Sequence, residues 1–248
     1  MENRMGIKKE LKTVAHLGMN ELDTLLIKSL FYPTYIDSVH ISFDDVYESF
    51  REAVDMNCDS IFEIPFFSSL KKLNEVYGAK FSLYIFEDEK LELNEVILHD
   101  LEQCKDWISI GYHAGIDGKV DSQSFRGFYE RFRNSEFLSK SCRFHEFSVG
   151  DLSVMEIKNS GISELFCADD ERVSYGVSFE KYFGGYYDGL AYTPTDLRLE
   201  KFCSYKILGI KKERLIVFAH EQPFQRYHEI KKLEAILRRL PMNVKFEY

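Results

Sequence analysis

The alternation of short apolar runs with amphipathic segments most restricts the fold of this chain. Short runs of aliphatic and aromatic residues recur along nearly its whole length, and such runs are typical of strands. Most of them are followed by a segment with the apolar spacing of a helix. The predicted strands are 39–43, 60–64, 80–86, 107–112, 142–147, 164–168, 190–193, 215–219 and a short final run at 244–248. This rhythm predicts parallel βαβ units.

The intervening segments predict helices at 46–53, 68–77, 94–104, 122–134, 151–159 and 226–239. Right-handed crossovers between parallel strands allow either an open doubly wound sheet or a closed barrel. The number of units favours the barrel, as does the lack of a glycine-rich phosphate loop after the first strand. We therefore expect one α/β barrel domain over residues 1–248. The irregular stretch 169–210, with its aromatic run 182–187, is interpreted as a lid or substrate platform.

Composition excludes several classes of function. Lys and Arg number 32 against 41 Asp and Glu, and the resulting net charge of −9 argues against nucleic-acid binding. We find no apolar run long enough for a membrane span and no signal peptide at the charged N-terminus. The five cysteines are odd in number and lack a CxxC pair, which argues against a disulfide framework or a thiolate zinc site. A cytoplasmic location fits these features best.

Polar residues gather where the predicted strands end, which in a βα barrel is the face of the active site. They are Asp44, Asp45, Glu63, His113, Asp117, Arg143, His145, Glu146, Asp169, Asp170, His220 and Glu221. Strand alternation places His113 on one face with Ser109 and Gly111, directed toward the barrel axis. Carboxylates with imidazoles and no thiolate suit zinc or another divalent metal. With a second carboxylate as base and a histidine as acid, such a site would hydrolyse an amide or ester.

Three segments resemble the polysaccharide deacetylases, the NodB-homology family (carbohydrate esterase family four). Residues 40–46, HISFDDV, resemble the family's Thr-Phe-Asp-Asp-Gly motif. Residues 108–119, with Gly-Tyr-His, lie where the family carries a metal-binding His-x-x-x-His. Residues 215–220, LIVFAH, resemble its late strand ending in a catalytic histidine. The similarity spans about residues 36–240 and implies a distorted, TIM-like (β/α)7 barrel.

The resemblance also implies roles for individual residues. Asp44 matches the general base that activates the attacking water, and His220 matches the acid that protonates the leaving group. Asp45 and His113 match metal ligands, and Arg143 matches an arginine that orients the base. Members of the family usually hold zinc, cobalt or nickel. They remove N-acetyl or O-acetyl groups from chitin-like sugars, peptidoglycan or xylan.

The sequence departs from the family pattern at three places. Val46 stands where the first motif has glycine. Asp117 stands where the second metal-binding histidine is expected, so either Asp117 or His145 would complete the metal shell. Of the family's Arg-x-Pro motif only Arg143 remains. The chain is therefore expected to be a divergent member of the family.

The leading hypothesis is a metal-dependent deacetylase acting on a small-molecule or oligosaccharide substrate. A second hypothesis keeps the barrel but makes it a non-catalytic protein that binds a sugar or a protein partner. A third is a metal-independent glycosidase that pairs Glu63 with Glu146 or Asp170. A simpler interpretation of the Asp44–Asp45 pair also stays open, in which both residues serve the start of the following helix.

Overall fold

The computed structural model describes residues 2–88, 90–91, 93–177, 184–207, 210, 212–222, 224 and 229–248, with side chains from Thr13 onward. The strands are β1 (Ser38–Val46), β2 (Phe81–Glu87), β3 (Ile108–Gly115), β4 (Ser141–Cys142), β5 (Glu164–Cys167), β6 (Gly185–Tyr187), β7 (Leu190–Pro194), β8 (Leu197–Arg198), β9 (Arg214–His220) and β10 (Lys245–Glu247). The helices are α1 (Glu2–Leu30), α2 (Glu48–Asp55), η1 (Ile61–Glu63), α3 (Pro65–Tyr77), α4 (Glu95–Gln103), α5 (Ser122–Phe132), η2 (His145–Phe147), α6 (Val154–Asn159), α7 (Ser204–Ile207) and α9 (Glu229–Leu237).

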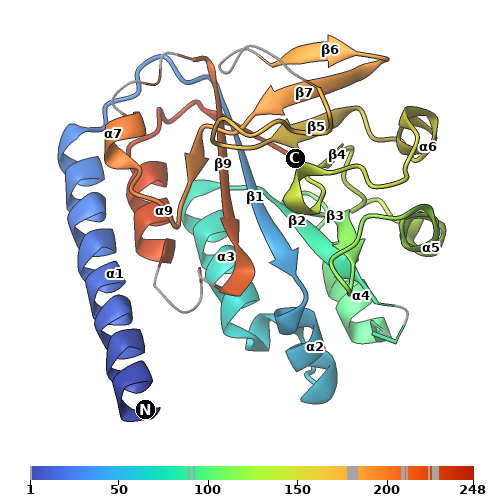
Figure 1. Ribbon diagram of the computed structural model, residues 1–248, viewed down its shortest axis with the longest axis horizontal. Coiled ribbons are helices and arrows are strands. Elements are labelled where there is room, and N and C mark those ends of the chain that lie inside the picture. Colours follow the sequence, from blue (N-terminus) through green and yellow to red (C-terminus); the bar gives the residue numbers. More distant parts are fainter. Residues whose placement is uncertain are drawn as a thin grey trace.

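The strands form two sheets that together make a distorted α/β barrel (Figure 1). The larger sheet has the order β3-β2-β1-β9-β8, with β10 also beside β1, and all its pairs are parallel. The smaller sheet has the order β4-β5-β7-β6, where only β6 and β7 are antiparallel. A parallel bridge between Ile110 and Leu138 links β3 to the segment before β4, and β7 leads directly into β8. The predicted distorted barrel is confirmed.

Alternation along β1 separates the apolar core from the polar barrel interior. Val39, Ile41 and Phe43 belong to the large apolar core, and the intervening Ser42 and Asp44 are buried polar residues. On β3, the ring of Tyr112 packs edge-on against Phe125 and Phe128 of α5, so this face of the strand looks toward a helix. His113, the next residue, therefore faces the other way, as the strand pattern predicted.

Two predicted strands need correction. Residues 60–64 form no strand, because they contain the short helix η1 followed at once by α3. The hydroxyl of Ser60 and the carboxylate of Glu63 make a reciprocal capping box, and Pro65 is the first residue of α3, so local helix-start signals outweigh the apolar run. Of residues 142–147 only the beginning is a strand, because the chain turns into η2, where Glu146 has φ +52°.

Other elements were not predicted from the sequence. The N-terminal helix α1 packs against α9 and α7 on one flank of the barrel (Figure 1). The aromatic stretch 182–187 lies partly outside the described residues, and its described part forms β6, on which Tyr186 and Tyr187 are exposed. The predicted helix over 226–239 is described from residue 229 onward. None of the helices in the described part of the chain combines the length and apolarity that a bilayer crossing requires.

Candidate active site

The C-terminal end of β1 directs two successive carboxylates into one site. Neighbouring residues of a regular strand point to opposite faces. Here the ladder between β1 and β2 shifts register between Phe43 and Val46, and Asp45 has φ +56°, a left-handed backbone uncommon outside glycine. Because of this irregularity, Asp44 reaches the barrel interior while the side chain of Asp45 still reaches His113 of β3.

Three side chains bring potential metal-ligand atoms together. One ligand atom each from Asp45, His113 and His145 lies within 4.8 Å of the others. His113 comes from β3 and His145 from η2, and Nε2 of His113 is 3.1 Å from Oδ1 of Asp45. The carbonyl oxygens of Arg143 and Gly118 contact Nδ1 of His113 and Nδ1 of His145 respectively. A carbonyl only accepts hydrogen bonds, so each ring donates through Nδ1 and keeps the lone pair of Nε2, as metal-binding histidines do.

The donor atoms of this cluster are suited to a metal ion. Oδ1 of Asp45 is buried and makes no hydrogen bond with the described residues, although Nε2 of His113 is in contact with it. Burial raises the pKa of Asp45, but contact with His113 and the nearby imidazoles of His220 and His145 outweigh burial and lower it. The buried Oδ1 of Asp45 and Nε2 of His113 are thus directed at the same point in the site. A carboxylate with two imidazoles suits zinc or another divalent transition metal.

Asp117 is not brought to this cluster. It lies in the exposed turn after β3, where Nζ of Lys119 is 2.9 Å from Oδ2 and the Lys119 amide donates to Oδ1. The same turn supplies the carbonyl of Gly118 to His145, and Gly118 has φ +80°, which favours glycine. Of the two candidates for the third ligand, the structure places His145 with the cluster and Asp117 outside it.

Arg143 and Asp44 form an ion pair inside the barrel. The guanidinium is fully buried and lies 3.0 Å from Oδ1 of Asp44. It also donates to the hydroxyls of Ser42 and Thr195, at 2.7 and 3.0 Å, and stacks 4.2 Å from the ring centroid of Phe218. These contacts hold the Asp44 carboxylate in one orientation beside the metal cluster.

His220 ends β9 and faces the same cluster. It is the register partner of Asp44 across the β1–β9 ladder, and its Nε2 is 3.9 Å from Oδ2 of Asp45. Its Nδ1 lies 3.2 Å from Oε1 of Glu200. Burial lowers the pKa of His220, but the hydrogen bond and charge of Glu200 outweigh burial and raise the pKa above its usual value. A protonated His220 can therefore act as an acid at this site.

Two of these partners, Glu200 and Thr195, were not predicted from the sequence. Glu200 follows the two-residue strand β8, and Thr195 lies between β7 and β8, both within the stretch 169–210 that shows no regular pattern. Burial raises the pKa of Glu200, but the contacts with His220 outweigh burial and lower it. A carboxylate that pairs with a histidine across 20 positions leaves no local spacing signal.

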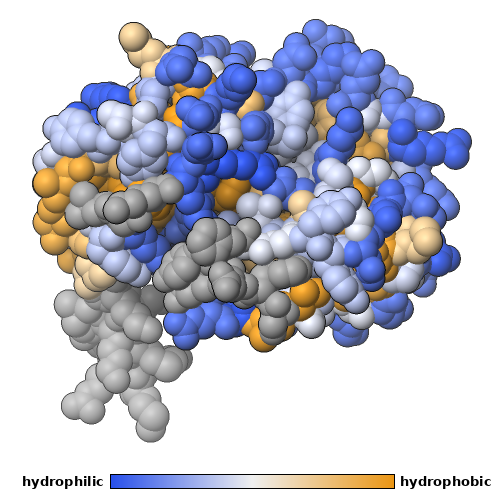
Figure 2. Space-filling view, turned by 90° about the horizontal axis from the view of Figure 1, so that it is seen from above, coloured by the Kyte–Doolittle hydropathy of each residue, from blue (hydrophilic) through white to orange (hydrophobic). Residues whose placement is uncertain are grey.

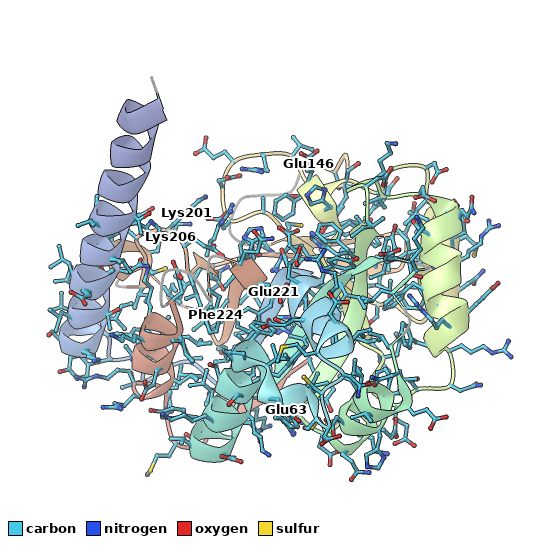
Figure 3. The ribbon with its side chains drawn as sticks, turned by 90° about the horizontal axis from the view of Figure 1, so that it is seen from below. Glu63, Glu146, Lys201, Lys206, Glu221 and Phe224 are labelled. Atoms are coloured by element: carbon cyan, nitrogen blue, oxygen red, sulfur yellow. The ribbon has the colours of Figure 1, made fainter. Side chains whose placement is uncertain are left out.

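Other carboxylates from the predicted set have structural partners. The first backbone amides of α2, at Tyr47, Glu48 and Ser49, donate to the buried Glu221, so Asp44 and Asp45 are not the caps of this helix. Glu63 and Glu146 are exposed and lie on opposite sides of the molecule (Figure 3).

Asp170 pairs with Arg172 at 2.8 Å. Asp169 pairs with Lys201 and Lys206 at 2.9 and 3.1 Å. Neither the Glu63–Glu146 pair nor Asp170 therefore offers the facing carboxylates that a glycosidase needs.

The sequence matches no family model and no curated protein. Among solved structures, the chain is similar to the Bc1960 peptidoglycan N-acetylglucosamine deacetylase, with a TM-score of 0.49 and 11% identity over 88% of each chain. It is also similar to a 4-alpha-glucanotransferase from Thermococcus litoralis, with a TM-score of 0.50 and 15% identity over 86% of this chain and 38% of that one. At this identity the second likeness concerns the barrel fold alone.

Proposed function

We propose that this protein is a metal-dependent hydrolase that removes N- or O-acetyl groups from a carbohydrate. The observation that carries the proposal is the convergence of Asp45, His113 and His145 beside two groups with acid–base chemistry. Asp44 is the chain neighbour of Asp45, and His220, the register partner of Asp44, lies 3.9 Å from the Asp45 carboxylate. The resemblance of the segments around these residues to polysaccharide deacetylases supports the same reaction.

The proposed metal site consists of Asp45, His113 and His145, with zinc, cobalt or nickel as the ion. A divalent ion held there would supply Lewis acidity, which polarises an acetyl carbonyl and lowers the pKa of a water molecule. Backbone carbonyls keep both imidazoles in the tautomer that leaves Nε2 free. These hydrogen bonds position the ligands before any ion arrives.

Asp44 serves as the general base and His220 as the general acid. Arg143 fixes the orientation of the Asp44 side chain, which in this proposal accepts a proton from the attacking water. Glu200 favours the protonated form of His220 and orients the ring so that Nε2 faces the cluster. His220 then delivers its proton to the leaving amine or alcohol, and the products are acetate and the deacetylated sugar.

Metal content and acetate release test the proposal together. We would load the purified protein and an Asp45→Ala/His113→Ala variant with Zn²⁺, remove free ion, and measure bound metal by mass spectrometry. Acetate release from N-acetylated chitooligosaccharides and from acetylated xylan would be measured on the same samples. We expect near-stoichiometric metal and acetate release for the wild type and neither for the variant.

Asp117→Asn is the matched control, because it removes a nearby carboxylate that lies outside the cluster. It should keep both metal and activity. Metal binding without acetate release from any acetylated sugar would favour the non-catalytic barrel. A wild-type protein that holds no metal in excess Zn²⁺ would refute the proposed mechanism.

A further inference from the structure

Helix α1 buries several polar residues and exposes a row of large apolar side chains. On the side that packs against the rest of the chain, Asn20, Asp23 and Thr24 have exposed fractions of 7%, 0% and 7%, and they lie beside the buried Ile27. On the opposite side, Val14, Leu22 and Leu25 are 66%, 52% and 59% exposed. In a surface helix of a monomer the apolar stripe faces the core, so this exposed row is unusual.

Specific polar contacts keep α1 in this orientation. Asp23 lies 3.0 Å from Nζ of Lys232 on α9, and both side chains are buried. The Asp23 carboxylate also accepts from the amides of Cys203 and Ser204 at the start of α7. A rotation of α1 that buried its apolar stripe would break these bonds and leave charges unpaired in the interior. The outward face is therefore an enforced feature of the fold.

The outward face forms a continuous stripe along the helix. Val14, Gly18, Leu22, Leu25 and Ser29 follow one another at spacings of three or four, so they share one side of the helix. No Asp, Glu, Lys or Arg occupies these positions. From Val14 to Ser29 the stripe runs about 22 Å at 1.5 Å per residue. Figure 2 shows an apolar area at the edge of the molecule where α1 lies.

Gly18 in this stripe indicates the close approach of another backbone. Within a helix, glycine is less stable than alanine by about 1 kcal/mol. No described atom would contact a Cβ at Gly18, so the packing of this chain does not require glycine there. Small residues on a helix face allow a second helix to pack closely. The N-terminal part of α1 also stands clear of the barrel (Figures 1 and 3), which leaves room for such a helix.

Two charged residues beside the stripe favour a second copy of this chain as the partner. Glu21 and Lys28 are seven residues apart, so they flank the same edge of the stripe two turns from each other. Both are exposed, and neither side chain forms an ion pair with the described residues. If two α1 helices cross antiparallel between Leu22 and Leu25, Glu21 of each copy faces Lys28 of the other. A two-fold axis then creates this pair twice. The net charge of −9 meanwhile disfavours an anionic lipid surface.

We propose that α1 is a homodimerisation helix and that two copies of this chain pack their Val14–Ser29 faces antiparallel about a two-fold axis. The interface is isologous, with an apolar centre at Leu22 and Leu25 and the Glu21–Lys28 pairs at its rim. It lies on the flank of the barrel formed by α1 and α9. Dimerisation is therefore independent of metal binding and of the deacetylase activity.

Sedimentation velocity over a range of concentrations tests the dimer directly. We expect the full chain to dimerise and the Leu22→Glu/Leu25→Glu variant to dissociate at least tenfold more readily, since burying four carboxylates against an apolar face is costly. Both positions are exposed within one chain, so the melting temperature of the monomer should change little. Val76→Glu/Met155→Glu is the control, because these side chains are 60% and 65% exposed on other helices. It should leave the dimer intact.

A charge exchange tests the antiparallel geometry. Glu21→Lys places two lysines opposite each other at both ends of the interface, and Lys28→Glu does the same with glutamates. Each single variant should weaken the dimer about three- to tenfold, and the double variant Glu21→Lys/Lys28→Glu should restore it. Failure of the double variant to restore the dimer would overturn the antiparallel arrangement.

A wild-type chain that stays monomeric at 100 µM concentration, on the order of a weak interface's dissociation constant, would overturn the dimer itself. Monomeric protein that sediments with uncharged phosphatidylcholine vesicles, and loses this in Leu22→Glu/Leu25→Glu, would assign the stripe to a lipid surface instead.

Discussion

Arg143 and Lys232 are both buried cations paired with a buried aspartate, yet they lie in regions with different roles. Arg143 is inside the barrel beside the proposed metal ligands, and Lys232 is under α1 on the flank of the barrel. The Lys232 ammonium contacts Asp23, the side chain of Asn20 and the carbonyls of Leu199 and Lys201, all within 3.0 Å. Its hydrogen-bonding capacity is used within the chain.

Around Arg143, by contrast, not every buried polar atom has a hydrogen-bond partner in the described part of the chain. Nε of Arg143 and Oδ1 of Asp45 are buried and have no hydrogen-bond partner among the described residues. A buried ion pair alone therefore does not identify a functional site. The network under α1 also contains a buried atom without a partner among the described residues, Oε2 of Glu229. What distinguishes the barrel interior is that its unpartnered Oδ1 belongs to a carboxylate that lies beside two imidazoles.

The largest expected effect is on catalysis at the Arg143 site. Asp44→Asn keeps a hydrogen-bond acceptor for Arg143 but cannot accept a proton. We expect kcat to fall by about 10²–10⁴-fold, the usual contribution of a general base. Bound metal should stay within about twofold of wild type, measured by mass spectrometry. Retained turnover in this variant would refute the assignment of Asp44 as the base.

The corresponding change at the structural ion pair should affect stability instead. Lys232→Met leaves the Asp23 carboxylate buried without its cation, and we expect unfolding free energy to fall by about 3–5 kcal/mol. Urea denaturation followed by circular dichroism measures this loss. Specific activity per folded molecule should not change. A lower kcat under conditions in which all molecules are folded would show that the Lys232 region is coupled to the Arg143 site.

His145→Ala tests whether the buried, unpartnered Oδ1 of Asp45 marks a metal site. Loss of one of three ligands should weaken metal affinity by more than about 100-fold, because even the loss of a partner behind a ligand costs 10–100-fold. Competition with a chromogenic chelator measures the affinity. Asp117→Asn serves as the comparison and should leave the metal affinity unchanged, because Asp117 lies outside the cluster. Equal effects of both substitutions would place Asp117 in the metal shell.

The smallest effect is expected at Asp169, whose partners are partly exposed. Burial raises its pKa, but the hydrogen bonds and charges of Lys201 and Lys206 outweigh burial and lower it. A carboxylate with a lowered folded-state pKa stabilises the protein above its unfolded value of about 3.9 and loses this contribution as pH falls through the folded value. Asp169→Asn should therefore be less stable than wild type at pH 6–8, in the range of about 1–3 kcal/mol for hydrogen bonds to a charged group.

That stability difference should shrink below about pH 4, as thermal unfolding at several pH values would reveal. A difference that grows at low pH would contradict the direction of the shift. Lys201→Met/Lys206→Met should remove the pH dependence as well, because it removes the two cations that lower the pKa of Asp169.

Much of the barrel could be predicted from the chain alone. Strands β1, β2, β3 and β9 are short runs rich in aliphatic and aromatic residues, and in β1 and β3 polar or small residues alternate with them. The same logic failed at 60–64, where Ser60, Glu63 and Pro65 are helix-start signals beside an apolar run. Helix α1 was missed because several large apolar side chains face outward and several polar side chains are buried, so its apolar residues do not follow one face.

The candidate site, too, could be predicted only in part from the sequence. Asp44, Asp45, His113 and His220 stand at strand ends in recognisable motifs, so their types and spacings pointed to a metal-dependent hydrolase. Local spacing could not decide between Asp117 and His145, because the choice depends on how η2 folds back over the turn after β3. Nor could it find Glu200, which meets His220 only through the β8–β9 pairing.

Residue patterns along the chain therefore specified the α/β class, the parallel barrel and the kinds of side chain at its C-terminal edge, because these follow from periodicity over a few residues. The third metal ligand, the partner of His220 and the outward apolar face of α1 depend on contacts between segments 20 to more than 200 positions apart. Such contacts form only when the barrel closes and brings the buried charged groups into contact.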